Sequence, residues 1–106
     1  MVARGVWVEL TAGNIRNSHI YLRDVLSFFP ADAVGGSNVS SASPHTITVQ
    51  FTPGAKVNTD IDGEKLFLRE RKAVRDFFEQ AGAKSGDRVI IERESERHYR
   101  FELKGS

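Results

Sequence analysis

Two stretches of the chain concentrate side chains that can bind nucleic acid. The first, from Gly13 to Arg23, has no acidic residue, and its polar and basic side chains are Asn14, Arg16, Asn17, His19, Tyr21 and Arg23. The second, from Lys65 to Arg75, has a single acid, Glu70, and its cations are Lys65, Arg69, Arg71, Lys72 and Arg75. Arginine and asparagine can bind guanine and adenine edges, and each phosphate that a cation neutralises releases counterions. The same residue types are also common on a solvated surface, so the pattern leaves both interpretations open.

Other chemistries have less support in the sequence. Asp60 and Asp62 would lie on one face of a strand, where two carboxylates can hold a metal, but Asp62-Gly63 is also a typical hairpin turn. The chain has no cysteine, and its histidines are scattered at His19, His45 and His98. We therefore expect no metal site, no cofactor and no catalytic centre.

Length and charge limit the possible classes of protein further. The chain has 106 residues, which favours one domain over residues 1–106. Its 15 Lys and Arg against 14 Asp and Glu give a formal net charge of +1. This balance argues against coating of nucleic acid by bulk charge, but it allows a local basic surface. No apolar run has the length of a membrane span.

Hydrophobic periodicity predicts a chain made mainly of short strands. Alternating apolar residues predict strands at 6–10, 19–22, 46–51, 56–62, 65–71, 88–94 and 98–103. Asp62-Gly63 would join 56–62 and 65–71 as a hairpin, and 95–97 would join the last two strands. Helical spacing predicts a short helix at 23–30 and a longer helix at 70–82 that ends at Gly82. The stretches 11–18 and 33–45 have the composition of loops.

A chain this short with so many strands must limit the exposed edges of its sheet. The side chains expected to face the core are Val6, Val8, Leu10, Ile20, Leu22, Ile47, Val49, Phe51, Val74, Phe77, Phe78, Ala81, Val89, Ile91, Tyr99, Phe101 and Leu103. We expect a mainly β fold with two short helices, arranged as a small open pseudobarrel of about seven strands.

The order of these elements resembles the B3-type DNA-binding pseudobarrel. "HIYLRDVLSFFP" resembles the strand of that family that runs into a short helix ending near "FP". "FLRERKAVRDFFEQAGAKSGDRVIIERESERHYRFEL" resembles its closing half, in which a helix with paired aromatics is followed by "GD" and two strands. The resemblance covers Trp7 to Leu103. It is closer to the recognition and effector domains of restriction endonucleases, of the EcoRII and BfiI type, than to the plant members, which usually carry a tryptophan in the helix.

This resemblance implies sequence-specific binding of double-stranded DNA by two arms that enter the major groove from opposite sides of a cleft. The arms would fall on 14–23, which begins with Asn14, and on 58–72. The implied base contacts are Arg16, Asn17, His19, Tyr21, Arg23, Asp60, Asp62, Lys65 and Arg69. The implied phosphate contacts, at a helix start, are Arg71, Lys72 and Arg75.

The resemblance also implies a module without catalytic activity of its own. Its partners would be double-stranded DNA and a nuclease domain or subunit, in the bacterial cytoplasm and away from the membrane. Two alternatives remain, a small-barrel transcriptional regulator and a protein-interaction barrel without nucleic-acid binding. Arg88, Arg93 and Arg97 lie beyond both arms among acidic residues, so we expect them to be solvated.

Overall fold

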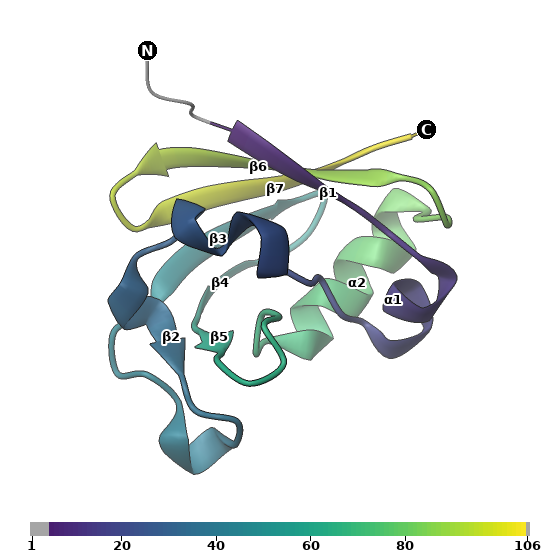
Figure 1. The fold of residues 1–106 in the computed structure, drawn as a ribbon. Coiled ribbons are helices and arrows are strands. Elements are labelled where there is room, and N and C mark those ends of the chain that lie inside the picture. Colours follow the sequence, from purple (N-terminus) through teal and green to yellow (C-terminus); the bar gives the residue numbers. More distant parts are fainter. Residues whose placement is uncertain (1–4, 106) are drawn as a thin grey trace.

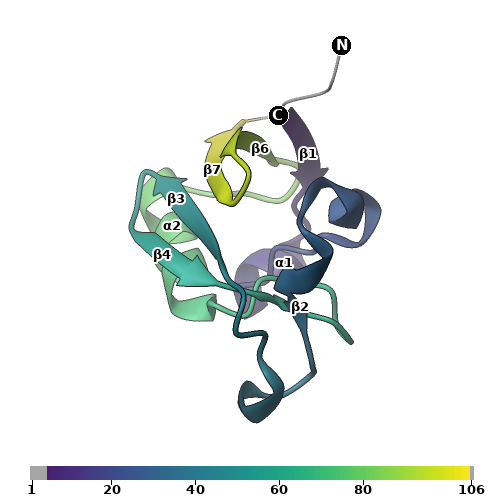
Figure 2. The ribbon, with the colours of Figure 1, turned by 90° about the vertical axis from the view of Figure 1, so that its left-hand side faces the viewer.

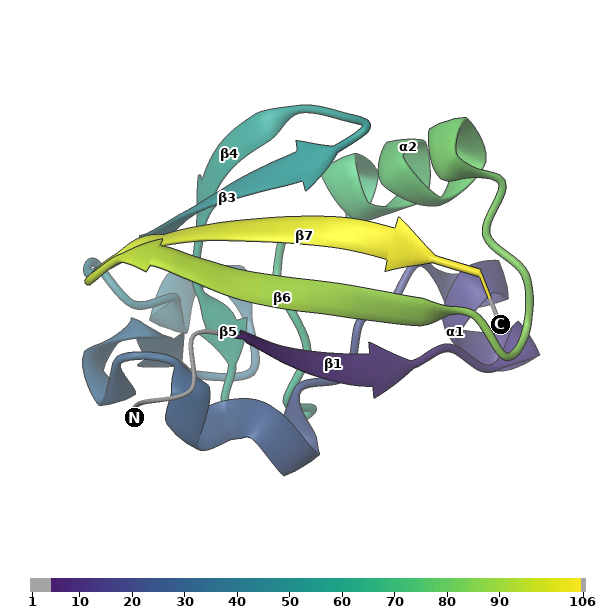
Figure 3. The ribbon, with the colours of Figure 1, turned by 90° about the horizontal axis from the view of Figure 1, so that it is seen from above.

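The fold is built on one five-stranded sheet. The computed structural model describes residues 5–105, so residues 1–4 and 106 of the expected domain lie outside it. The strands of the sheet are β1 (Gly5–Glu9), β3 (Ile47–Thr52), β4 (Lys56–Thr59), β6 (Arg88–Ser95) and β7 (His98–Lys104). Their spatial order is β1-β6-β7-β3-β4, as Figure 3 shows from above. Only the β3–β7 pair is parallel within this sheet, and β1 and β4 form its edges.

A small second sheet lies on the side of the core away from β6 and β7 (Figures 1 and 2). It consists of β2 (Val34–Gly35) and β5 (Ile61–Asp62), which pair in parallel. Two isolated bridges, Tyr21 to Phe67 and Ile61 to Leu68, lie beside it. The long sheet therefore curves around the core without closing into a barrel. The seven strands of the described residues confirm the expected mainly β fold class.

Short helices cover parts of the curved sheet. The α-helices are α1 (Ala12–Asn17) and α2 (Arg71–Ala81), and the 3-10 helices are η1 (Arg23–Phe28), η2 (Ala31–Ala33) and η3 (Val39–Ser41). η1 packs against β1, and α2 packs against β3 (Figure 1). Within residues 5–105, no helix combines the length and the apolar character needed to cross a membrane.

The predicted helix at 70–82 is confirmed as α2. Its apolar face buries Val74, Phe77 and Phe78. The side chain of Glu70 accepts a hydrogen bond from the backbone N of Ala73, which satisfies one free donor of the first turn. Gly82 ends the helix with a φ of 67°, a left-handed conformation that glycine adopts without steric cost.

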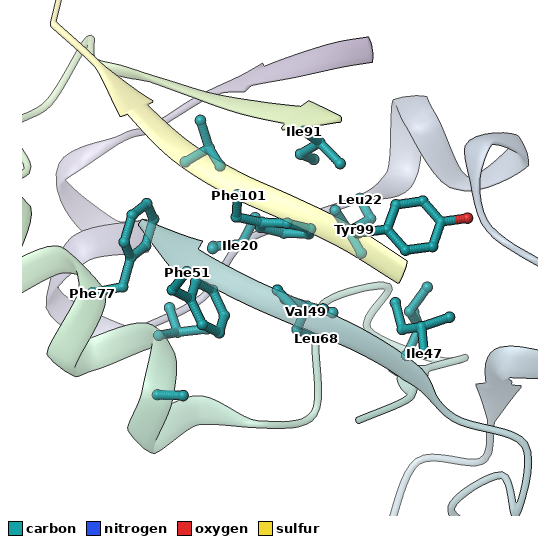
Figure 4. Close-up of a cluster of buried hydrophobic side chains, with 14 of the residues drawn as sticks. Ile20, Leu22, Ile47, Val49, Phe51, Leu68, Phe77, Ile91, Tyr99 and Phe101 are labelled. Atoms are coloured by element: carbon teal, nitrogen blue, oxygen red, sulfur yellow. The ribbon is translucent and has the colours of Figure 1, made fainter. Parts of the chain in front are cut away.

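The core lies between the sheet and α2 and is dominated by aromatic rings (Figure 4). The ring of Phe51 lies 5.2 Å from that of Phe77 and 5.6 Å from that of Phe101. The buried Tyr99 donates its hydroxyl proton to the carbonyl of Phe28 at 2.9 Å, which attaches η1 to the core. Burial raises the pKa of Tyr99, so this hydroxyl stays protonated.

The stretch 11–18, expected to be a loop, contains α1 instead. Oγ1 of Thr11 accepts a hydrogen bond from the backbone N of Asn14 at 3.1 Å, and Oδ1 of Asn14 accepts one from the N of Thr11 at 2.9 Å. This is a capping box in which asparagine takes the place usually held by glutamate or glutamine. Ser18 ends the helix in a left-handed conformation with φ 57°. The prediction was wrong because the loop-like composition concealed a reciprocal cap.

The hairpin expected around Asp62-Gly63 is present only as a short, irregular reversal of the chain. Residues 56–59 pair with β3, and β5 pairs with β2, which belongs to the stretch 33–45 that was expected to be loop. Of the predicted pairing, the Ile61–Leu68 bridge remains, with backbone hydrogen bonds from the N of Asp62 to the carbonyl of Phe67 and from the N of Arg69 to the carbonyl of Asp60, both at 3.0 Å. Oδ1 of Asp62 accepts hydrogen bonds from the backbone N of Glu64 and Lys65, and the carbonyl of Asp62 accepts one from the N of Leu66 at 2.7 Å, so side chain and backbone together close the turn.

We expect Phe101→Ala to lower the free energy of unfolding by about 3–5 kcal/mol, because it leaves a cavity among the rings of Phe29 and Phe51. Denaturant unfolding followed by circular dichroism would measure the loss. Phe28→Ala is the matched control, because Phe28 is only half-buried and its truncation should lower the free energy of unfolding by less. Equal losses for both variants would contradict a core centred on β7.

Candidate nucleic-acid interface

The two basic stretches are in direct contact in the folded chain. Nη2 of Arg71 donates a hydrogen bond to the carbonyl of Asn17 at 2.9 Å. The ring of His19 stacks on that of Phe67, with centroids 4.1 Å apart, and Tyr21 pairs with Phe67 through its backbone. The two stretches, expected as arms on opposite sides of a cleft, therefore meet along this line. Their outer ends, α1 and the turn after β5, lie apart (Figures 1 and 3).

Exposed cations line this surface. We call the group of Arg16, Arg23, Lys65, Arg71 and Arg75 the cationic surface. Within residues 5–105, none of these five side chains lies within ion-pair distance of a carboxylate. Lys72, expected to bind phosphate, is also exposed, at the start of α2. Their charges are therefore available to an anionic ligand.

Arg16 and Arg75 line the same hollow between α1 and α2. This hollow has a volume of about 410 Å³, and its apolar wall includes Ile15 and Phe78. Arg71 and Arg75 are four residues apart on α2, so they lie on the same face of the helix, which is the face that α1 contacts. The helix α1, which the loop-like composition of 11–18 concealed, is thus the element that brings Arg16 toward the cations of α2.

An aromatic cluster made of His19, Tyr21 and Phe67 lies beside these cations. The ring centroids of Tyr21 are 5.5 Å from His19 and 5.6 Å from Phe67. The hydroxyl of Tyr21 is 3.3 Å from Nδ1 of His19, within hydrogen-bonding distance. Burial, followed by the charges of Arg71 and Lys65, lowers the pKa of His19 below its ordinary value of 6.5. His19 is therefore neutral at pH 7, and the cluster offers aromatic surface rather than a further charge.

Asp60 and Arg69 are placed differently from the other candidates, because they form a largely buried ion pair. Their side chains are 4% and 16% exposed, and Nε of Arg69 lies 2.6 Å from Oδ1 of Asp60. Nη2 of Arg69 also donates to Oδ2 of Asp60 at 3.1 Å and to the carbonyl of Gly36 at 2.6 Å. This hydrogen bonding raises the pKa of Arg69 above its already high value. The two groups satisfy each other, so the geometry gives them a structural role and leaves them few contacts for a base.

Asp62 is buried as well. Burial acts to raise its pKa, but hydrogen bonds from the backbone N of Lys65 and Glu64, and the charges of Arg69 and Lys65, outweigh burial and hold the pKa below its usual value. The carboxylate is thus used in shaping the turn that presents Lys65. The side chain of Asn14 is used in the same way, in the cap of α1.

Two aromatic residues near the surface were not among the predicted site residues. Phe67 becomes part of the site through its contacts with His19 and Tyr21, which the sequence could not show. Trp7 is half exposed on the outer face of β1, and its outward position in the Val6-Trp7-Val8 alternation was the available signal. The described residues contain no group of three or more His, Cys, Asp and Glu side chains that could hold a metal ion.

We expect Arg69→Ala to lower the free energy of unfolding by about 3 kcal/mol, because it leaves the carboxylate of Asp60 buried without its cation. The double variant Asp60→Ala/Arg69→Ala should lose less than the sum of the two single variants. Denaturant unfolding of all three variants would measure this coupling.

The exposed Arg97–Asp32 pair supplies the control, since Asp32→Ala should cost only about 0–1 kcal/mol. Additive losses at Asp60 and Arg69 would show that the two side chains do not act as a pair.

The lowered pKa of His19 predicts that the protein becomes less stable as the pH falls. The unfolded chain binds the imidazole proton more tightly than the folded chain does, so the free energy of unfolding should fall as the pH drops from 6.5 to the folded pKa. His19→Gln should lack this fall, and Arg71→Gln should reduce it only in part, because burial is the larger cause. Parallel stability profiles of wild type and His19→Gln over this range would refute the assignment.

Comparison with known proteins finds a solved structure that is similar to this fold. No family model matches the chain, and no curated protein matches its sequence. The structure is similar to the N-terminal domain of Helicobacter pylori LlaJI.R1, with a TM-score of 0.58 and a sequence identity of 9%. The similarity covers 95% of this chain and 87% of that chain. At this low identity, the similarity shows that the two chains share a fold.

Proposed function

We propose that this chain is a sequence-specific double-stranded DNA-binding module of a restriction-type system. The observation that carries the proposal is the cationic surface, where two stretches far apart in the sequence bring together five cations without carboxylate partners. The formal net charge of the chain is only +1, so these cations are a local concentration of charge. Such a surface is the usual electrostatic footprint of a nucleic-acid site.

The distribution of acids supports the same reading. Asp60 is paired with Arg69, Asp62 shapes a turn, and Glu70 caps α2 through the N of Ala73. These three carboxylates are thus engaged within the fold, and we expect them to contribute little repulsion toward phosphates. The basic side chains keep their freedom to displace counterions from a DNA backbone.

Base contacts would come from the exposed polar side chains of the surface. We assign this role to Arg16, Asn17, Tyr21, Arg23 and Lys65, with the half-buried His19 between them. Asp60, Asp62 and Arg69 take structural roles in this proposal. In a B3-like binding mode, α1 and the turn after β5 would contact the major groove at two separated points, joined by the aromatic cluster.

The structural relation supports a restriction-type role. LlaJI.R1 is a restriction-type protein, and its N-terminal domain shares the fold of this chain over nearly the whole length. A recognition module of this kind needs no catalytic group, so we place any nuclease activity on another domain or subunit.

The proposal predicts different effects for the two kinds of contact. Lys72→Ala should weaken binding to all duplexes alike and reduce the salt slope by about 1, as expected for a lost phosphate contact. Arg16→Ala should cost roughly 1–3 kcal/mol on the preferred duplex and relax the preference at one base pair. Fluorescence anisotropy at several salt concentrations, on a duplex selected from a randomised pool and on a random duplex, would separate the two.

Lys104→Ala is the matched control, because it removes an exposed cation of β7 that belongs to neither basic stretch. It should leave the affinity and the salt slope close to wild type. Equal losses for Lys104→Ala and Lys72→Ala would mean that binding follows total charge alone, and no binding to any duplex would favour a protein-interaction barrel.

A further inference from the structure

Two large apolar side chains remain exposed in the described part of the chain, and both line one hollow. Trp7 is 50% exposed and Tyr21 is 39% exposed. The hollow has a volume of about 500 Å³ and is completed by Val8, Glu9, Arg23 and Asp24. This volume is within the range of small-ligand sites. Exposed aromatic surface that gathers at one hollow is a feature of binding sites.

Both rings are held in place by neighbouring groups. The guanidinium carbon of Arg88 lies 4.3 Å from the centroid of the Trp7 ring, a cation–π contact between β6 and β1. The Tyr21 ring contacts His19 and Phe67, and the backbone of Tyr21 is paired with that of Phe67. A ligand that binds between these rings would therefore lose little free energy in ordering them.

The polar groups of the hollow fit the edge of a nucleobase. Glu9 and Asp24 offer carboxylate oxygens that accept hydrogen bonds from an exocyclic amino group, and Arg23 offers donors to a ring nitrogen, a carbonyl or a phosphate. The two carboxylates make the hollow a poor site for a phosphate alone. Flat aromatic surfaces stack on any base, and such stacking is the usual way in which proteins hold unpaired nucleotides.

We propose that this hollow binds an unpaired nucleobase of DNA that is single-stranded or locally opened. Trp7 and Tyr21 supply the stacking surfaces, while Asp24 and Glu9 favour cytosine, adenine or guanine over thymine, which has no amino group. The inference rests on the proposed function, because Tyr21 and Arg23 belong both to the hollow and to the DNA-binding surface. A base inside an intact duplex is stacked on its neighbours and cannot enter such a site.

Trp7 is the only tryptophan of the chain, so its fluorescence reports directly on the hollow. The titrants are oligodeoxycytidylate, oligothymidylate and a strand of the same length made of abasic residues. We expect oligodeoxycytidylate to quench the fluorescence most, oligothymidylate less, and the abasic strand hardly at all. Equal quenching by the abasic strand would show that charge alone brings the strand to the surface, and the inference would fail.

Variants test the same assignment through anisotropy of labelled strands. Trp7→Ala should weaken binding of oligodeoxycytidylate roughly tenfold, within the range for loss of one stacked base, and Trp7→Phe should restore part of it. Asp24→Asn should reduce the preference for cytidine over thymidine, whereas Lys104→Ala should preserve that preference. Circular dichroism would establish that each variant is folded, and unchanged affinity in folded Trp7→Ala would refute the inference.

The duplex experiment separates this inference from the proposed function. Duplex binding that depends on Lys72, without base-dependent quenching of Trp7, would overturn the nucleobase site and leave the duplex-binding module standing. Base-dependent quenching without duplex binding would support the site and overturn the duplex function. If no strand quenches the fluorescence of Trp7 and only a protein partner changes it, the nucleobase site is also overturned.

Discussion

The buried ion pair between Asp60 and Arg69 holds the candidate interface to the rest of the fold. Oδ2 of Asp60 accepts a hydrogen bond from the backbone N of Ser43 at 2.8 Å, and Arg69 donates to the carbonyls of Gly36 and Asn38. The pair thus joins the segment 36–43 to both ends of the segment 60–69. Between those ends, backbone hydrogen bonds from Asp62 to Phe67 and from Leu66 to Asp62 close the turn that carries Lys65 and Phe67, and the ion pair fixes the base of that turn. Two desolvated charges are stable here because each also satisfies backbone groups.

The ion pair also decides which charges remain on the surface. Because Arg69 is neutralised inside the fold, it adds little to the external field, whereas Lys65 and Arg71 have no carboxylate within ion-pair distance in the described residues. The same two cations help to hold His19 neutral. The result is a surface in which positive charge and uncharged aromatic rings lie side by side. Positive charge binds phosphates, and aromatic rings stack on bases.

The sequence predicted most elements that depend on local periodicity, but the alternation at 19–22 and 65–71 yields only isolated bridges at Tyr21, Phe67 and Leu68. The alternation of Ile47, Val49 and Phe51 and the helical spacing of Val74 and Phe77 are each confirmed, because one buried face dictates both patterns. The parallel pairing of β2 with β5 and the pairing of Asp60 with Arg69 were not predictable, since they join segments that no local pattern relates. The candidate DNA-binding residues could therefore be chosen from the sequence by residue type. Only the folded structure shows which of them are buried in structural roles and which are exposed.

The cationic surface and the hollow between Trp7 and Tyr21 would act over different distances. Charges attract a DNA backbone over about 8–10 Å at moderate salt, whereas stacking and hydrogen bonds to a base edge act only on contact. Glu9 and Asp24 would repel a phosphate that entered the hollow, but they would accept hydrogen bonds from a base there. Glu9 and Asp24 therefore weaken the attraction of phosphates at this end of the surface and add selectivity among bases there. A surface so divided would bind the backbone through its cations and distinguish bases through its rings and carboxylates, with Tyr21 and Arg23 at the boundary.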